Sequence, residues 1–126
     1  MKENEIENDY ARFYIKDGIL FFVYKEIDNL DLDAAKKIVA DRLALQDSVS
    51  FPVLCDIRGL KGADKTARDY LAREGSALTE CVGLLVDSPA LKLMTNFYLM
   101  VNKPQVPTKV FRTKEEAIGY IRDFMN

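Results

Sequence analysis

The sequence predicts one α/β domain of order ββαβαβαβα, with a five-stranded, mostly parallel mixed sheet and four helices. Two strand-like runs flank Asp17-Gly18, a residue pair that favours a two-residue hairpin turn. Beyond this turn, segments with helical spacing of apolar residues alternate with short apolar runs as far as residue 124. The length of 126 residues suits a single domain, because it is enough for one core and too short for two.

The first third of the chain contains the hairpin and a helix. Residues 1–9 are polar and acidic, so we expect a frayed, disordered tail before a single domain over residues 10–126. Aromatic and β-branched residues predict strands at 10–16 and 19–25, the second apolar on both faces like a central strand. Asp31 or Asn29 can cap a helix that ends near Gln46. Its expected buried stripe consists of Ala35, Ile38, Val39 and Leu43.

The remaining elements alternate regularly. Apolar runs predict strands near 52–57, 81–86 and 108–112. We expect Asp64 to open the second helix, Ser88-Pro89 to start the third, and Thr113 to form a capping box with Glu116 at the fourth. Each connecting helix is long enough for a right-handed crossover, so the strands after the hairpin should be parallel.

Composition excludes several classes of function. The net charge of −2 and the absence of a basic run argue against nucleic-acid binding. No apolar run approaches the ~20 residues of a membrane span, so we expect a cytoplasmic protein. Histidine is absent, which excludes histidine-based triads and zinc–histidine sites, and we expect no enzyme, metal or cofactor. Cys55 and Cys81 lie in apolar runs and should be buried thiols.

The third strand and the helix after it resemble the STAS (sulfate-transporter and anti-sigma-antagonist) family, specifically its SpoIIAA-like branch. In that family a buried strand ends in a D-L-S-G-like sequence, and D-S-[ST]-G opens the next helix. Here Asp56–Gly59 occupies the first position and Asp64–Ala67 the second. The element order over residues 10–124 also agrees, and residues 102–111 with Glu115-Glu116-Ala117 are similar to stand-alone SpoIIAA-like proteins.

The resemblance implies a regulatory domain that is phosphorylated at the second motif. Lys65 and Ala67 replace the first hydroxyl residue and the glycine, so Thr66 is the phosphorylation candidate. Two interpretations remain open. Thr66 is either a switch, because a new dianion beside Asp64 would repel an acidic partner, or an ordinary residue in a helix whose cap is Asp64. Two interpretations also remain for the polar corner formed by Asp56, Arg58 and Asp64. It is either a functional site or a structural cluster whose side chains bind loop amides and each other.

The third helix is unusually apolar. Steps of ~100° per residue place one group of side chains towards the core and a second group on a flank, which together form an apolar arc of ~180°. The core group is Met94, Phe97, Tyr98 and Val101; the flank is Leu93 and Met100; Lys92, Thr95 and Asn96 should face water. An arc this wide indicates further contact, so Leu93, Met94, Phe97 and Met100 are expected at a protein interface or beside an apolar ligand.

Two functions therefore stay open. The first is a non-enzymatic STAS-like domain that binds a protein partner or a second copy of itself as a homodimer. The second is a carrier or sensor of a small apolar molecule beside the third helix, because SpoIIAA-like proteins are similar to lipid-carrying CRAL-TRIO domains. A cavity of several hundred Å³ there would favour the carrier, and a solid core with a flat apolar patch outside would favour the interaction domain.

Overall fold

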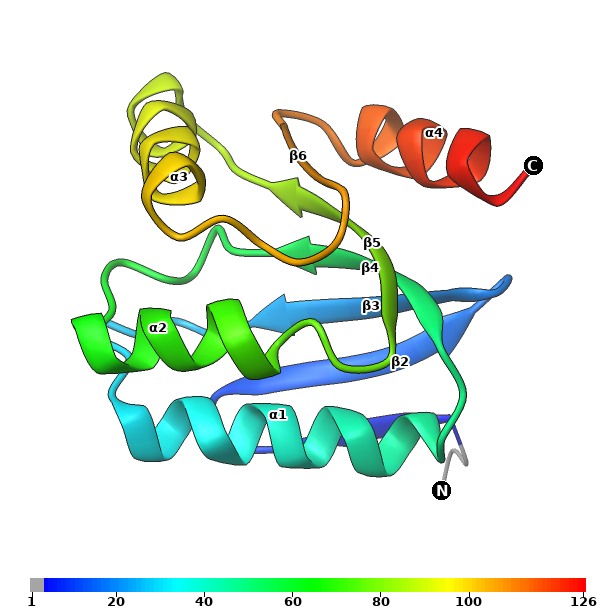
Figure 1. The fold of residues 1–126 in the computed structure, drawn as a ribbon, viewed down its shortest axis with the longest axis horizontal. Helices are drawn as coiled ribbons and strands as arrows, with labels where there is room; N and C mark the ends of the chain where they lie inside the picture. The colour runs from blue at the N-terminus through cyan, green and yellow to red at the C-terminus, as the bar shows by residue number, and fades with distance from the viewer. Residues whose placement is uncertain (1–3) are drawn as a thin grey trace.

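The computed structural model describes residues 4–126 as one sheet with helices on both faces (Figure 1). The described part contains six strands, one more than expected, and four helices. The strands are β1 (Glu5–Glu7), β2 (Ala11–Lys16), β3 (Ile19–Tyr24), β4 (Phe51–Asp56), β5 (Thr79–Leu85) and β6 (Thr108–Phe111). The helices are α1 (Leu32–Gln46), α2 (Lys65–Glu74), α3 (Pro89–Val101) and α4 (Lys114–Met125).

The strands lie in the sheet in chain order, from β1 to β6. β1, β2 and β3 pair antiparallel, whereas β3 to β6 pair parallel, as expected from the connecting helices. The turn between β2 and β3 has positive φ at both Asp17 and Gly18, as the hairpin prediction requires. Each parallel strand from β4 to β6 is added on the same side of the strand before it. Right-handed crossovers in such a sheet place their helices on one face, so α1, α2 and α3 share a face.

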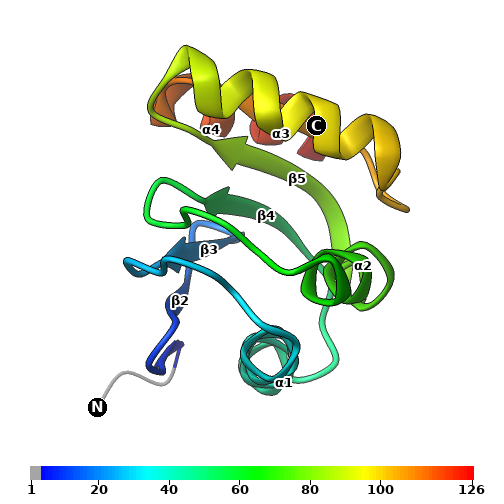
Figure 2. The same ribbon diagram turned by 90° about the vertical axis from the view of Figure 1, so that its left-hand side faces the viewer.

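Two apolar cores form on the two faces of this sheet. On one face α1 packs against side chains such as Phe13, Phe22 and Val53. On the other face Ala117 and Ile121 of α4 pack against alternate strand residues. Gly83 of β5 lies directly under α4, and a Cβ there would make an ordinary contact of 3.5 Å with the Ala117 Cβ. Figure 2 shows α1 and α2 next to each other and α3 standing apart from them.

The expected frayed tail is wrong from Glu5 onwards. Glu5–Glu7 form β1, an edge strand that pairs with residues 12–14 of β2. The three residues of β1 are too few to show a strand pattern, and their order comes from pairing with β2. Residues 1–3 of the expected tail lie outside the described part of the chain.

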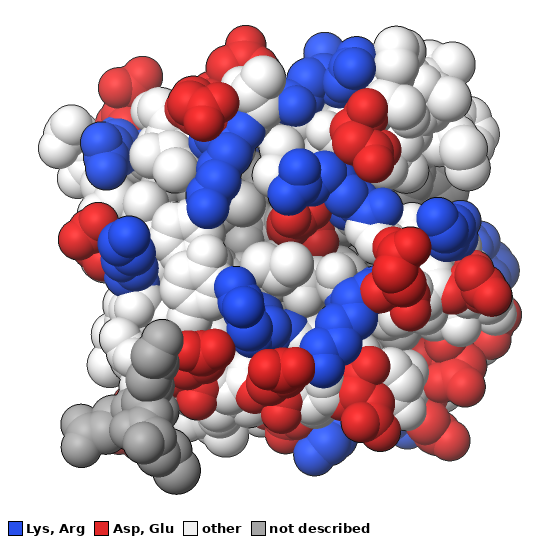
Figure 3. Space-filling view, turned by 180° about the vertical axis from the view of Figure 1, so that it is seen from behind, with Lys and Arg blue, Asp and Glu red and all other residues white. Residues whose placement is uncertain are grey.

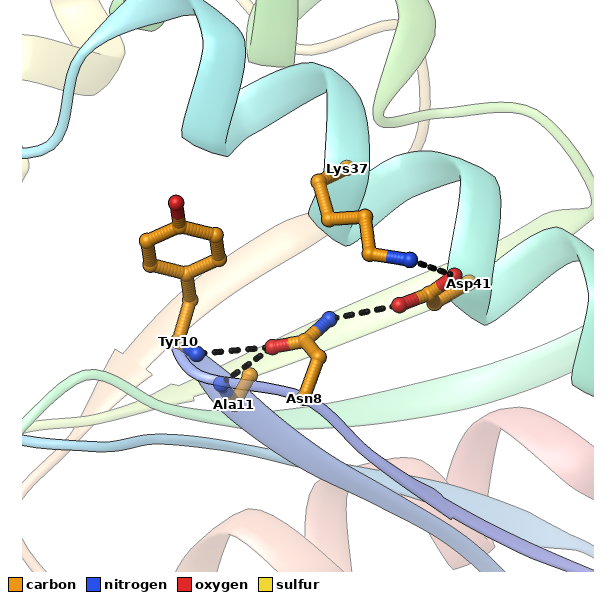
Figure 4. Close-up of polar contacts among 5 residues, drawn as sticks. All are labelled: Asn8, Tyr10, Ala11, Lys37 and Asp41. Atoms are coloured by element: carbon orange, nitrogen blue, oxygen red, sulfur yellow. Dashed lines mark hydrogen bonds and ion pairs between the residues drawn. The ribbon is translucent and has the colours of Figure 1, made fainter.

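Asn8 joins this edge of the sheet to α1 (Figure 4). Its side-chain oxygen accepts hydrogen bonds from the backbone N–H groups of Tyr10 (2.7 Å) and Ala11 (2.9 Å). Its amide nitrogen donates to Asp41 Oδ2 of α1 at 2.8 Å, and Lys37 holds the other oxygen of Asp41 at 3.2 Å. One half-buried amide thus satisfies the bend between β1 and β2 and also anchors α1.

Replacing Asn8 with alanine should lower the free energy of unfolding by about 1–2 kcal/mol, because two backbone donors and Asp41 lose a partner together. Urea denaturation followed by circular dichroism measures this change. The matched control is Lys37→Ala, which breaks only the exposed pair with Asp41 and should cost about 0.5 kcal/mol or less. Equal losses in the two variants would contradict the anchoring role of Asn8.

Charged side chains of both signs are interspersed over the face seen from behind in Figure 3, where the corner over α3 is largely uncharged. This distribution agrees with the absence of a basic run in the sequence. In the described part of the chain, no helix has the length and apolar character needed to cross a bilayer.

Candidate functional site

A cavity of about 430 Å³ lies between the sheet, α2 and α3. Its floor is formed by β4 and β5, whose residues Val53, Cys55, Val82 and Leu84 point to this face. Leu71 and Ala72 of α2 form one wall, and Leu91, Tyr98 and Leu99 of α3 form the opposite wall. The cavity is partly open, and its lining is predominantly apolar.

Two polar contacts connect α3 with α2 across this cavity. The Tyr98 hydroxyl donates to the carbonyl oxygen of Arg68 at 2.9 Å, and the Asn102 amide donates to Asp69 at 2.9 Å. Lys65, which also binds Asp69 at 2.8 Å, lowers the pKa of that carboxyl, with a smaller contribution from Asn102. Hydrogen bonds therefore contribute to holding α3 near α2 while leaving apolar space between the helices.

The predicted orientation of α3 is wrong for four of its side chains, although Lys92 and Asn96 are exposed as expected. Met94, Phe97 and Val101, expected towards the core, are exposed, whereas Thr95, expected in water, is buried. The inner side of α3 follows Leu91, Thr95, Tyr98 and Asn102, a helical spacing that faces the cavity. Thr95 can be buried because its hydroxyl donates to the Leu91 carbonyl oxygen at 2.7 Å within the same helix. Tyr98 is half-buried, as the prediction required.

The outer side of α3 is an apolar surface. Leu93 and Met100 are each 73% exposed, and Phe97 is 68% exposed. Met94, also exposed, lies at the rim of the cavity as well, so it belongs to both the outer surface and the lining. The outward orientation of Leu93 and Met100 agrees with the flank expected for them. We refer to Leu93, Met94, Phe97, Met100 and Val101 as the outer face of α3.

Arg42 of α1 lines the cavity and is only 2% exposed. Its guanidinium donates from Nη1 to the Ala77 carbonyl (3.0 Å) and Thr79 hydroxyl (3.3 Å), and from Nη2 to the Gly75 carbonyl (3.2 Å). Nη1 also donates to Gln46 Oε1. Burial lowers the pKa of Arg42, because the low-dielectric surroundings disfavour its charge.

Arg42 and Gln46 were missed as buried residues by the sequence reasoning. Gln46 is also 2% exposed, and its amide donates to the carbonyls of Val49 (3.0 Å) and Leu78 (2.8 Å). The expected core residue Leu43 is only half-buried, whereas Ala35, Ile38 and Val39 are buried as predicted. The spacing in the sequence could have indicated the burial of Arg42 and Gln46. These residues continue the series of Ala35 and Ile38 at intervals of three and four residues, on the same side of the helix.

Cys55, on the floor of the cavity, is buried, as is Cys81 on the face of α4. Burial raises the pKa of both thiols, and of the buried Tyr24 hydroxyl beside the cavity. These groups are therefore neutral at physiological pH. Both cysteines have the character of small apolar side chains, as expected from the sequence.

The polar corner after β4 separates into two parts. Asp56 is buried and accepts from Arg58 Nε at 2.9 Å, Arg58 Nη2 at 2.7 Å and the Arg58 backbone N–H at 3.1 Å. This contact raises the pKa of Arg58. Asp64 instead accepts from the Asn29 amide at 2.7 Å and makes no side-chain bond to the first turn of α2. The expected cap at Asp64 is wrong in this respect, although Asp64 does immediately precede the helix.

The segments after β3 and β4 run side by side through this corner. The Ile27 N–H donates to the Gly59 carbonyl, and the Lys61 N–H donates to the Ile27 carbonyl, both at 2.9 Å. A Cβ on Gly59 would lie 2.6 Å from the Lys25 carbonyl oxygen, so this close approach requires glycine. Thr66 is exposed in the first turn of α2, where a kinase could reach its hydroxyl, and its phosphorylation stays a prediction.

Comparisons with known proteins agree with this architecture. One solved structure, from Shewanella loihica PV-4, is an uncharacterized protein of the DUF3478 family with a SpoIIAA-like fold. The two chains share 13% identity with a TM-score of 0.64, covering 92% of this chain and 98% of the other. No curated protein matches. The fold is thus SpoIIAA-like, and the family model described as "Domain of unknown function (DUF7793)" matches residues 13–125, so the chain belongs to that family.

Proposed function

We propose that this SpoIIAA-like domain binds a small apolar molecule in the cavity between α2 and α3, as a carrier or sensor. The observation that carries the proposal is the cavity itself. Its volume of about 430 Å³ is within the range of about 300–1,000 Å³ that is usual for small-molecule sites. A predominantly apolar lining favours an apolar ligand, because burial removes apolar surface of both partners from water.

The position of α3 supports the same proposal. This helix covers the cavity with its inner side, but its side chains do not fill the space above β4 and β5. Such a space costs the folded protein dispersion contacts that a ligand can provide. Filling the cavity would therefore stabilise the domain as well as bind the ligand.

A titration with Nile red, an uncharged dye whose fluorescence rises in apolar surroundings, tests this function. We expect saturable binding of one dye molecule per chain and displacement by dodecanol. Native mass spectrometry of protein purified from its own host should also show a retained small molecule. Fluorescence that rises without saturation, or that dodecanol leaves unchanged, would contradict a defined apolar site.

The outer face of α3 favours a second function, self-association. Its five apolar side chains are exposed and contiguous along the helix, more than a monomer usually leaves in water. We propose that two copies bury these faces against each other, since a closed two-fold dimer is the commonest assembly of soluble proteins. This proposal is independent of the cavity, because Leu93 and Met100 do not line it.

The double substitution Leu93→Lys and Met100→Lys tests the dimer. Both side chains point outward, so we expect a change of less than about 0.5 kcal/mol in the free energy of unfolding. Sedimentation equilibrium should show a weaker dimer, while Nile red binding stays at the wild-type level. A wild-type protein that is monomeric at high concentration, or a double variant that dimerises as well as the wild type, would contradict self-association through this face.

A further inference from the structure

The charged side chains at the wall of the cavity all have the same sign. Among the described residues that line it, Arg42, Lys61 and Arg68 are cations, and no aspartate or glutamate is present. The whole chain has a net charge of −2, so this excess of positive charge does not follow from composition. Because apolar walls screen charge poorly, such a cavity attracts an anion more strongly than an exposed surface does.

The Nε–H of the buried Arg42 guanidinium has no partner among residues 4–126, and Nη2 has a single partner, the Gly75 carbonyl. Nη1 makes three contacts and Nη2 makes one, whereas Nε makes none. A guanidinium has five N–H donors in a rigid fork, so the Nε hydrogen and one Nη2 hydrogen remain. Arg58 uses the same two nitrogens to hold both carboxylate oxygens of Asp56. Arg42 therefore keeps two unused N–H donors, on the same two nitrogens with which Arg58 binds a carboxylate.

We propose that the ligand is an anionic amphiphile, with one apolar chain and a carboxylate or phosphate head, and that the head pairs with the Nε–Nη2 edge of Arg42. This inference rests on the proposed function, since it names the ligand class of the same cavity. The present partners of Arg42 are neutral oxygens, which compensate a buried cation incompletely. An anionic head supplies the missing charge, and the apolar chain lies along the floor of Val53, Val82 and Leu84.

The other two cations are placed to assist rather than to hold the head. Arg42 contacts the carbonyl of Gly75, just beyond the last turn of α2, whereas Arg68 lies in the first turn. Arg68 donates to the Ala63 carbonyl, and Lys61 is paired loosely with Glu26 at 3.8 Å. Arg68 and Lys61 thus raise the positive potential of the cavity from the opposite end of α2, where they favour entry of an anion.

Isothermal titration calorimetry with three ligands of equal chain length tests this inference. We use dodecanoate, dodecyl phosphate and dodecanol, each below its micelle concentration. We expect at least one of the two anions to bind tenfold or more tightly than dodecanol, and the comparison between them identifies the head. Equal affinities for all three ligands would overturn the anionic head but leave the proposed function intact. Failure of all three to bind would overturn both.

The Arg42 edge is tested in the wild-type protein, without a risk of unfolding, by nuclear magnetic resonance. The arginine Nε–H signal of Arg42 should shift with the preferred anion and stay in place with dodecanol. As a second measurement, Arg42→Lys keeps the charge but removes the two-pronged edge, so the preference for the anion should fall at least fivefold. The matched control is Arg73→Lys in the last turn of α2, which does not line the cavity and should keep the preference. An unmoved Arg42 signal, or equal preferences in the two variants, would overturn the assignment.

Discussion

Replacing Arg42 with alanine is expected to lower the free energy of unfolding by about 3 kcal/mol or more. The guanidinium satisfies the carbonyls of Gly75 and Ala77, which belong to the connection between α2 and β5. The guanidinium also satisfies Gln46 Oε1, a buried acceptor whose loss of a donor costs about 1–3 kcal/mol, and the truncated side chain leaves empty volume. Because small domains have only about 5–15 kcal/mol of stability, urea denaturation should show a large shift of the midpoint.

Two control variants separate the causes of this loss. Lys36→Ala removes an exposed charge from the same helix and should change the free energy by about 0.5 kcal/mol or less. Arg42→Met keeps most of the buried volume but not the hydrogen bonds, so it should retain most of the destabilisation if the carbonyls matter. A midpoint for Arg42→Ala close to that of Lys36→Ala would show that Arg42 does not hold the connection.

Ala72→Trp is expected to abolish binding of apolar ligands without unfolding the protein. Ala72 lines the cavity from α2, so an indole side chain at this position should occupy the ligand's space. A tryptophan side chain buries on the order of 150–250 Å², and apolar area is worth ~25 cal/mol per Å², which predicts a loss of roughly 100-fold or more in affinity. Nile red titration measures the affinity, and circular dichroism checks the fold.

Ala90→Trp is the matched control for this variant. Ala90 is exposed near the start of α3 and does not line the cavity, so the same substitution there should leave the affinity unchanged. The natural chain has no tryptophan, and each variant therefore carries a single fluorescent indole. The indole of Ala72→Trp should emit at shorter wavelength than that of Ala90→Trp. Unaltered binding in Ala72→Trp would place the apolar site elsewhere.

The features that the sequence predicted correctly depend on local signals. The hairpin at Asp17-Gly18 requires two positive φ angles that this residue pair adopts readily. Ser88 accepts from the Leu91 N–H at 3.0 Å, and Thr113 accepts from the Glu116 N–H at 3.2 Å, as their cap positions predicted. The parallel strands followed from the helices between them. Each of these predictions needed only residues within a few positions of each other, or the order of the elements.

The features that could not be predicted from the sequence depend on contacts between residues far apart in the chain. The apolar arc of α3 is so wide that the spacing of its apolar residues does not determine which side faces the sheet. Thr95 was expected in water because of its hydroxyl, but the hydrogen bond of this hydroxyl within the helix permits burial. Arg42 shows the same limit, since its partners are carbonyls 33 and 35 residues away along the chain. The cavity is space between elements, which no local pattern encodes, although the excess of apolar residues in α3 indicated that this helix has more than one apolar contact.

The chain-order arrangement of the six strands has a consequence for how the domain folds. Each described strand after β1 pairs with the strand immediately before it, so no strand must wait for a distant segment before it can pair. Each new strand pairing then closes a loop that contains only one turn or one helix, so the entropic cost of each loop closure is low. The sheet can therefore grow by stepwise addition from β2 and β3, with α3 and β6 joining after the β4–β5 surface exists. In such an order of addition, the cavity between α2 and α3 would be completed late, on a framework that is already formed.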